Sequence, residues 1–240
     1  MKAAVIVVDM LIDNLKTGMH MAIEEQGMTI VPALKSLLAR SRERGFPIFY
    51  ANDSFLAGDA LFGGKIKAHA LRGTPGAEVI PEIAPEPGDF VVPKRRFSGF
   101  YKTDLDQSLR TLGVDTVAVA GVSTTFCVLM TALDAVSHDF RAVILEDCSA
   151  AYKREVHETI LGLYRKNPLW PLLRVESSAQ FLNEGLSIEV GTEENPEKRR
   201  STPCRRRANR RSRIISSPTT KCPLPPSPRT EDRRPIPSTT

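Results

Sequence analysis

The sequence has few cysteines, few aromatic residues and no long apolar run. Its four cysteines, Cys127, Cys148, Cys204 and Cys222, show no C-x-x-C spacing, which argues against a zinc ribbon and a disulfide framework. The longest apolar runs, such as residues 3–8 and 117–122, are far shorter than the roughly 20 residues of a membrane helix. The first apolar run is followed by no small-residue cleavage site. We therefore expect a cytoplasmic protein with free thiols and no membrane partner.

Positive charge is concentrated in the last fifty residues. Residues 191–240 hold thirteen Lys and Arg against five Asp and Glu, nine of the eighteen prolines, and no aromatic residue. Such a segment buries too little apolar surface to offset the entropy of its chain. The sequence predicts one folded domain over residues 1–186 and a basic, proline-rich, disordered tail over residues 187–240.

The arginine-rich part of this tail allows two interpretations. Residues 198–213 could bind the phosphates of nucleic acid or of an anionic membrane. No aromatic side chain is interleaved with the arginines to stack on bases, which weakens the nucleic-acid interpretation. We favour a solvated extension and keep nucleic-acid binding as the alternative function of another class.

Short β-branched runs alternate with helical patterns along the first 190 residues. Most of these runs are apolar without alternation, as in strands buried on both faces, and the connections between them are long enough for helices. The pattern predicts a three-layer α/β/α domain with a six-stranded parallel sheet of Rossmann-like type. The expected strands are residues 3–8, 47–50, 89–92, 116–120, 142–145 and 172–175, and the expected helices are residues 28–44, 104–112, 126–137, 154–166 and 177–183, with Gly45 and Gly113 ending two of them.

Polar residues at the carboxyl ends of parallel strands meet at one edge of the sheet, where ligands bind. Asp9, Lys94 and Cys127 each follow one of the predicted strands, and residues 53–88 form a long excursion over the same edge. A nearby ammonium and a helix N-terminus would favour a Cys127 thiolate, and Asp9 could carry its proton. Taken singly, a Cys at this position is more often a buried apolar residue than a nucleophile, Asp9 could be a helix cap and Lys94 a surface residue; their joint placement favours the catalytic interpretation.

Several segments in the correct order resemble one known family. They are VVDM at 7–10, VPKRRFSGF at 92–100, TDL at 103–105 and GVSTTFCVLMTALDA at 121–135. Together they resemble the isochorismatase-like cysteine hydrolases, which include nicotinamidases, N-carbamoylsarcosine amidase and ureidoacrylate amidohydrolase, over residues 3–182. The resemblance implies a catalytic triad of Asp9, Lys94 and Cys127. It also implies a cis peptide before Ser123 that directs the backbone amides of Ser123 and Cys127 toward the substrate oxygen.

The resemblance is incomplete at the metal site of the nicotinamidases. These carry an Asp-x-His pair and a later His before a Gly-Thr-x-Gly-Ala-Glu stretch. Here HALRGTPGAE at 69–78 retains the second part, whereas Phe55 occupies the position of the first His. Asp53 and His69 remain candidates for a divalent metal such as zinc, or they are a loop residue and a pocket wall.

Four apolar residues are candidates for the substrate pocket, and one basic pair bears on the charge of the substrate. The pocket candidates are Phe55, Phe97, Phe100 and Val122. The pair Arg95–Arg96 could attract a carboxylate-bearing substrate or could face solvent. We expect Cys148 to be a structural thiol.

The function expected from these features is cleavage of the C–N bond of a small amide through a Cys127 thioester. A nicotinamidase-like reaction, from nicotinamide to nicotinate and ammonia, is the leading expectation. An N-carbamoyl or ureido amidohydrolase and an isochorismatase are the alternatives. The expected partners are the small-molecule amide and further copies of the chain in a homo-oligomer.

The first testable prediction concerns the tail. Truncation after Ser187 should leave kcat and KM of amide hydrolysis unchanged and should remove salt-sensitive retention on heparin, because the basic residues lie beyond that point. The measurement is steady-state ammonia release by both proteins, with heparin elution at increasing salt. Loss of hydrolysis by a truncated protein that still folds would contradict the prediction that the tail plays no part in hydrolysis.

Overall fold

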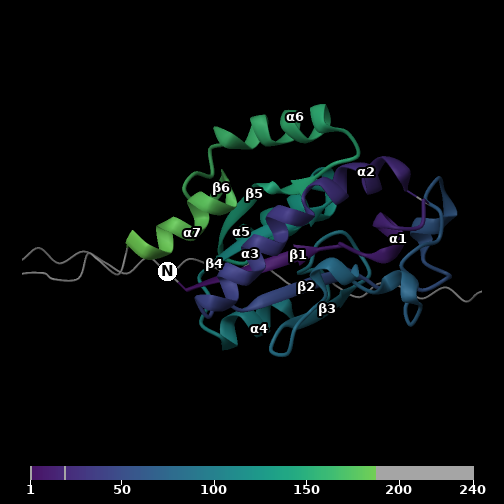
Figure 1. Ribbon diagram of the computed structural model, residues 1–240, viewed down its shortest axis with the longest axis horizontal. Helices are drawn as coiled ribbons and strands as arrows, with labels where there is room; N and C mark the ends of the chain where they lie inside the picture. The colour runs from purple at the N-terminus through teal and green to yellow at the C-terminus, as the bar shows by residue number, and fades with distance from the viewer. Residues whose placement is uncertain (1, 19, 188–240) are drawn as a thin grey trace, which may run out of the picture. The chain divides into compact units, whose positions relative to one another are not determined.

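The computed structural model describes residues 2–18 and 20–187, so the predicted tail from residue 188 onward lies outside the described residues. The described chain forms a parallel sheet of six strands in the order β3-β2-β1-β4-β5-β6 (Figure 1). This confirms the predicted fold class. The strands are β1 (Ala3–Val8), β2 (Ile48–Asp53), β3 (Phe90–Lys94), β4 (Thr116–Val122), β5 (Arg141–Ala150) and β6 (Leu173–Glu176).

Helices cover both faces of the sheet. On one face lie α2 (Met21–Thr29), α3 (Val31–Glu43) and α7 (Ser178–Ser187), and on the other lie α4 (Leu105–Thr111), α5 (Leu129–Ser137) and α6 (Arg154–Arg165). Along β1, Ala3, Val5 and Val7 face the first layer, whereas Ala4, Ile6 and Val8 face the second. Because both faces are buried, every residue of β1 is apolar.

The helical boundaries differ from the prediction in four places, one of which is the end of α7 at Ser187 instead of residue 183. The predicted helix 28–44 is instead the end of α2 followed by α3, with Ile30 between them. The short helix α1 (Ile12–Leu15) and most of α2 are additional elements. The apolar and charged residues of α2 are not segregated into faces, so its periodicity gave no signal. The predicted helix 126–137 begins as a π-helix, Thr124–Val128, that continues into α5.

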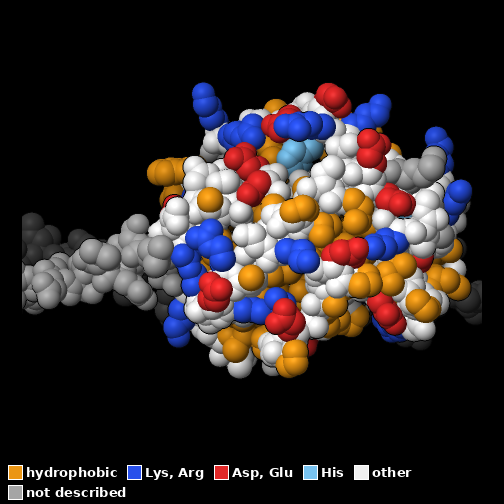
Figure 2. Space-filling view, viewed as in Figure 1, with side chains coloured by type: hydrophobic (Ala, Val, Ile, Leu, Met, Phe, Trp, Pro, Cys, Tyr) orange, Lys and Arg blue, Asp and Glu red, His pale blue; other side chains and the backbone are white. Residues whose placement is uncertain are grey.

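The excursion between β2 and β3 is connected by isolated bridges to residues that follow the carboxyl ends of β1 and β2. It contains three short 3₁₀ helices and two isolated bridges, Leu11 with Val79 and Phe55 with Leu71. On the face shown in Figure 2, acidic and basic side chains are interspersed, in keeping with the near balance of charge before residue 191. None of the described helices has the length and apolar character needed to cross a membrane.

Gly121 sets the distance between the two central strands. It pairs with Val8 in the sheet and has φ +107°, and a Cβ at this position would lie 2.1 Å from the Val8 carbonyl oxygen. Neither the backbone angle nor the space accepts a side chain. Gly121 therefore lets β4 approach β1 directly before Asp9.

Replacement of Gly121 by alanine should lower the free energy of unfolding by about 3–5 kcal/mol, since a backbone atom of β1 would have to move. Gly45→Ala is the matched control, because Gly45 has φ +68° but open space around it, and it should cost about 1–2 kcal/mol. Urea denaturation followed by circular dichroism measures both. Equal losses would show that close strand approach at Gly121 is unimportant.

Candidate active site

Asp9 stands immediately after β1 in a left-handed backbone conformation, with φ 52°. Asp is among the few residue types that tolerate this region, and such strain is typical of functional sites. The side-chain amide of Asn14 donates to the Asp9 carbonyl at 2.9 Å, and the backbone N–H of Asp53 donates to Asp9 Oδ1 at 2.7 Å. These bonds fix the buried carboxylate against the ends of β1 and β2.

Lys94 ends β3 and pairs with Asp53 in the sheet register. Its Nζ donates to Asp9 Oδ2 at 2.8 Å and to Asp53 Oδ1 at 2.5 Å, and its side chain is fully buried. Burial alone would lower the pKa of Lys94, but Asp9 and Asp53, joined by Cys127 when it is a thiolate, outweigh burial and raise it. Lys94 is therefore a permanent cation between two carboxylates.

Asp53 carries the opposite perturbation. Burial, followed by the charge of Asp9, raises the pKa of Asp53 to about 7, although Lys94 acts against both effects. Two buried carboxylates share one ammonium here, so one of them holds its proton more readily than an isolated Asp. The site can therefore store a proton near neutral pH.

Cys127 lies in the π-helix after β4, next to the Asp9 carboxylate. The candidate ligand atoms of Asp9, Asp53 and Cys127 all lie within 4.8 Å of one another. Burial raises the pKa of Cys127 well above its usual value, Asp9 and Asp53 raise it further, and Lys94 alone among the main causes lowers it. Burial of Cys127 therefore favours the thiol, and Lys94 is the group that favours the thiolate expected from the sequence.

The turn before Cys127 contains the cis peptide that the resemblance implies. The Val122–Ser123 peptide is cis, and the Ser123 carbonyl accepts from the N–H groups of Phe126 at 3.0 Å and Val128 at 3.2 Å. Thr124 Oγ1 is hydrogen-bonded to His157 Nδ1 at 2.9 Å, and both side chains are buried. A side chain of α6 therefore stabilises the turn.

Cys127 opens into a cavity of about 300 Å³ at the carboxyl edge of the sheet. Its floor contains Asp9, Asp53 and Ser123, and most of its walls are apolar. The predicted pocket residues Phe55, Phe97 and Val122 line it, as do Asn14, His20, Ile23, Leu61, Phe62, Ile66, His69 and Phe126. The assignment of Phe100 to the pocket is wrong, because its ring is buried against His138 and Phe140 in the core.

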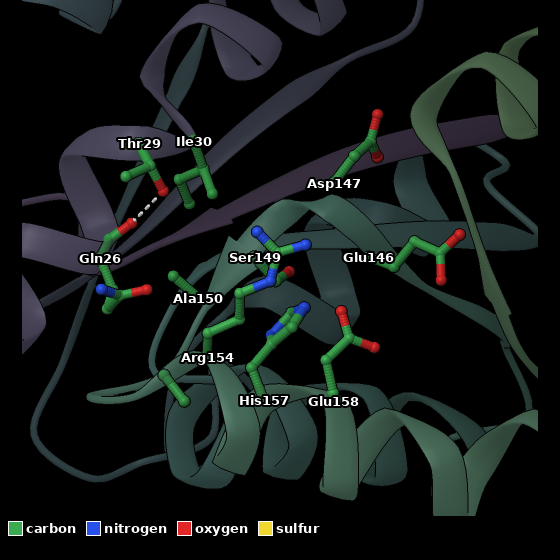
Figure 3. Close-up of a pocket in the computed structure, with 11 residues that line it drawn as sticks. Gln26, Thr29, Ile30, Glu146, Asp147, Ser149, Ala150, Arg154, His157 and Glu158 are labelled. Carbon is green, nitrogen blue, oxygen red and sulfur yellow. Dashed lines mark hydrogen bonds between the residues drawn. The ribbon is translucent and has the colours of Figure 1, made fainter.

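A larger cavity, of about 470 Å³, lies between the end of α2, β5 and the start of α6 (Figure 3). His157 points into it from α6, and Arg154 extends over Ser149. Its lining does not include Cys127. It is linked to the turn before Cys127 by the hydrogen bond between His157 and Thr124. The smaller cavity is therefore the candidate active site.

Two further sequence expectations are resolved by contacts outside this cavity. Arg95 and Arg96 both bind the buried carboxylate of Asp59 and do not line the Cys127 pocket, so they are not placed to hold the carboxylate of a substrate there. Cys148 is a free, fully buried thiol in the core on β5, as expected of a structural residue.

Comparison with known proteins agrees with this geometry. The isochorismatase domain family matches residues 3–174.

The chain belongs to the isochorismatase family.

Three relatives illustrate its range. The uncharacterised isochorismatase family protein YaaI of Bacillus subtilis is 31% identical over 162 residues, which cover 67% of this chain and 87% of the relative. The solved N-carbamoylsarcosine amidase from Thermoplasma acidophilum has a TM-score of 0.63 and 32% identity, with 74% of this chain and 97% of that chain covered. A nicotinamidase from Bacillus subtilis has a TM-score of 0.65 and 27% identity, with 74% and 100% covered.

The residues at the metal position of the nicotinamidases do not fit a metal ion. Phe55 offers no donor atom, and its ring packs against Phe62 and His69. Asp53 is already bound to the Lys94 ammonium, which supplies the positive charge that the carboxylates need. Among the described residues, the one group of three close ligand atoms contains Asp53 but not His69. Asp53 and His69 therefore do not form the predicted site, and no catalytic step is assigned to a metal.

Sequence reasoning missed His20, Phe62, Phe126 and Asn14 as pocket residues. Phe126 precedes Cys127 and could have been found from the strand-end argument. His20 and Asn14 lie on the segment around α1, whose position over the sheet edge has no signal in the apolar pattern.

The electrostatic roles of Lys94 and Asp9 predict opposite shifts in thiol reactivity. Lys94→Met should move iodoacetamide labelling of Cys127 to higher pH, because the cation that favours the thiolate is lost. Asp9→Asn should move it to lower pH, because a carboxylate that disfavours the thiolate is lost, while turnover falls about 10²- to 10⁴-fold. Labelling rate against pH, followed by mass spectrometry, measures both.

The two variants control for each other. Asp9→Asn keeps the size of the side chain and remains informative where Lys94→Met is unstable. If the pH dependence of labelling shifts in the same direction in both variants, or matches the wild type in both, then Lys94 and Asp9 do not control the reactivity of the Cys127 thiol.

Proposed function

We propose that this protein hydrolyses the C–N bond of a small, uncharged amide through a Cys127 thioester, as a nicotinamidase-like enzyme. The observation that carries the proposal is one buried cluster, in which the Cys127 sulfur lies within 4.8 Å of an Asp9 carboxylate oxygen and Lys94 Nζ donates to that carboxylate at 2.8 Å. A nucleophile, a proton acceptor and a group that orients the acceptor form one buried set at the base of a substrate-sized cavity. At the coarser level, the chain is an isochorismatase-family hydrolase that acts on amides.

The proposed acylation half-reaction uses Asp9 as a proton carrier. The Cys127 proton passes to Asp9 as Sγ attacks the amide carbonyl carbon, and the backbone N–H groups of Ser123 and Cys127 stabilise the oxyanion. The C–N bond then breaks, and the leaving nitrogen takes the proton from Asp9. Ammonia departs and a thioester remains on Cys127.

Deacylation reverses these proton transfers with water in place of ammonia. Asp9 accepts a proton from water, whose oxygen attacks the thioester carbonyl carbon, and Sγ leaves and regains its proton. The products are a carboxylic acid and ammonia. Lys94 stays charged throughout and holds Asp9 and Asp53 in position.

The lining of the cavity favours an uncharged substrate. It contains the acids Asp9 and Asp53, and no Lys or Arg is among its described lining residues. Lys94 lies below the floor with its charge already engaged by the two carboxylates. A substrate carboxylate would enter an apolar cavity without a cation to pair with, which is costly. This supports a nicotinamide-like amide over N-carbamoyl and ureido acids.

Replacement of Cys127 by alanine should abolish ammonia release, with a loss of at least ~10³-fold, because the covalent route disappears. Cys148→Ala is the matched control, since Cys148 is also a buried thiol but lies outside the pocket; it should retain most of the activity. The measurement is ammonia release from nicotinamide, an N-carbamoyl amino acid and a ureido acid. Near-normal turnover by Cys127→Ala would refute the mechanism, and preference for the anionic substrates would refute the proposed substrate.

A further inference from the structure

One polar group in the Cys127 pocket is unused by the mechanism. His20 lines the cavity, and its Nε2 atom is buried without a hydrogen-bond partner among the described residues. Its backbone is fixed at the start of α2, where the His20 carbonyl accepts from the N–H groups of Ile23 at 2.8 Å and Glu24 at 3.0 Å. The ring is thus presented to the pocket by a helix terminus.

A second imidazole lies against the first. The rings of His20 and His69 are 4.7 Å apart in an edge-to-face arrangement. His69 Nδ1 lies 2.8 Å from the Lys67 carbonyl, which can only accept, so Nδ1 carries the hydrogen and the neutral ring has an acceptor at Nε2. The two rings form a polar patch, here called the His20–His69 patch, beside Phe55 and Phe62.

The charged groups around His20 differ from those around Cys127. His20 is influenced by His69, Asp13 and Lys67, whereas Cys127 is influenced by Lys94, Asp9 and Asp53. Burial, followed by the charges of His69 and Lys67, lowers the pKa of His20, and Asp13 opposes them. The ring is therefore neutral at pH 7.5 and suits an uncharged partner.

His20 Nε2 is buried and unpaired among the described residues, so a substrate in this cavity decides whether it gains a partner. An acyl group that is wholly apolar would leave His20 Nε2 unpaired, which weakens binding, whereas one with a hydrogen-bonding atom at that position would not. Sites built to pair with a polar atom reject analogues that lack it.

We propose that His20 is a specificity-determining residue, which pairs with an uncharged hydrogen-bonding atom on the acyl part of the substrate. The substrate class is then a primary amide of a planar acyl group that carries one neutral donor or acceptor, with the flat face of the group against the aromatic walls. His69 orients the His20 ring from the side. The inference rests on the proposed function for the identity of the substrate as an amide, but recognition by His20 does not depend on hydrolysis.

The experiment compares two isosteric amides, nicotinamide and benzamide, which differ by one ring nitrogen. Binding is measured by calorimetry at pH 7.5 on chelator-treated full-length protein carrying Cys127→Ala, so that no turnover occurs. We expect nicotinamide to bind about 10- to 100-fold more tightly than benzamide. Addition of His20→Leu should abolish this preference by weakening nicotinamide alone, and His20→Gln should restore part of it.

His138→Leu is the control, because His138 is a partly exposed imidazole that stacks on Phe100 and lies outside the pocket. It should leave both affinities unchanged. Equal binding of the two amides, binding of neither, or an undiminished preference in His20→Leu would overturn the inference. A preference that appears only after zinc is added would also overturn it, by making the two imidazoles metal ligands.

These outcomes are separable from failure of the proposed function. A preference that depends on His20, in a protein whose wild type releases no ammonia, would leave recognition intact and refute hydrolysis. Hydrolysis of nicotinamide and benzamide at equal kcat/KM would support hydrolysis and refute recognition by His20.

Discussion

The structure depends on one buried ammonium shared by two buried carboxylates. Lys94 binds Asp9 and Asp53, and the three side chains are almost entirely removed from solvent. Removal of one partner from such a cluster leaves an uncompensated buried charge, which typically costs about 3–5 kcal/mol. The cluster can form only when β1, β2 and β3 end at the same level, and the register that pairs Asp53 with Lys94 meets this requirement. Strand register and the chemistry of the site are therefore fixed by the same contacts.

The same cluster controls the nucleophile. Burial keeps Cys127 protonated, and the two carboxylates reinforce this, so Lys94 is the principal group that works in the opposite direction. In the proposed mechanism, a thiol beside Asp9 is already placed for proton transfer to the group that later protonates the leaving nitrogen. The thiolate then forms when a carbonyl carbon is present to accept it, which suits a buried site where an isolated anion would be poorly solvated.

The cavity has a polar floor and mostly apolar walls. Floor residues come from the ends of β1, β2 and β4, which are held rigidly by the sheet. The walls come from the excursion between β2 and β3, from the turn around Phe126, and from the segment near α1 and α2. Reaction type is set by the floor, and substrate choice is set by segments that can vary without disturbing the sheet. Phe55, which differs from the His of the nicotinamidase pattern, belongs to this wall.

The sequence by itself determined the layered α/β fold, because strands buried on both faces must be apolar throughout. It also determined that Asp9, Lys94 and Cys127 lie at strand ends, because parallel strands bring those ends to one edge. The departure of Phe55 from the nicotinamidase pattern could also be recognised from the sequence, because it is a difference at one position of a short motif. Tertiary structure alone decided that Phe100 enters the core, that Arg95 and Arg96 bind Asp59, and that His20 reaches the pocket. These side chains belong to loops and helix ends, where no periodicity encodes direction, and the charge state of Cys127 likewise depends on burial and on partners distant in sequence.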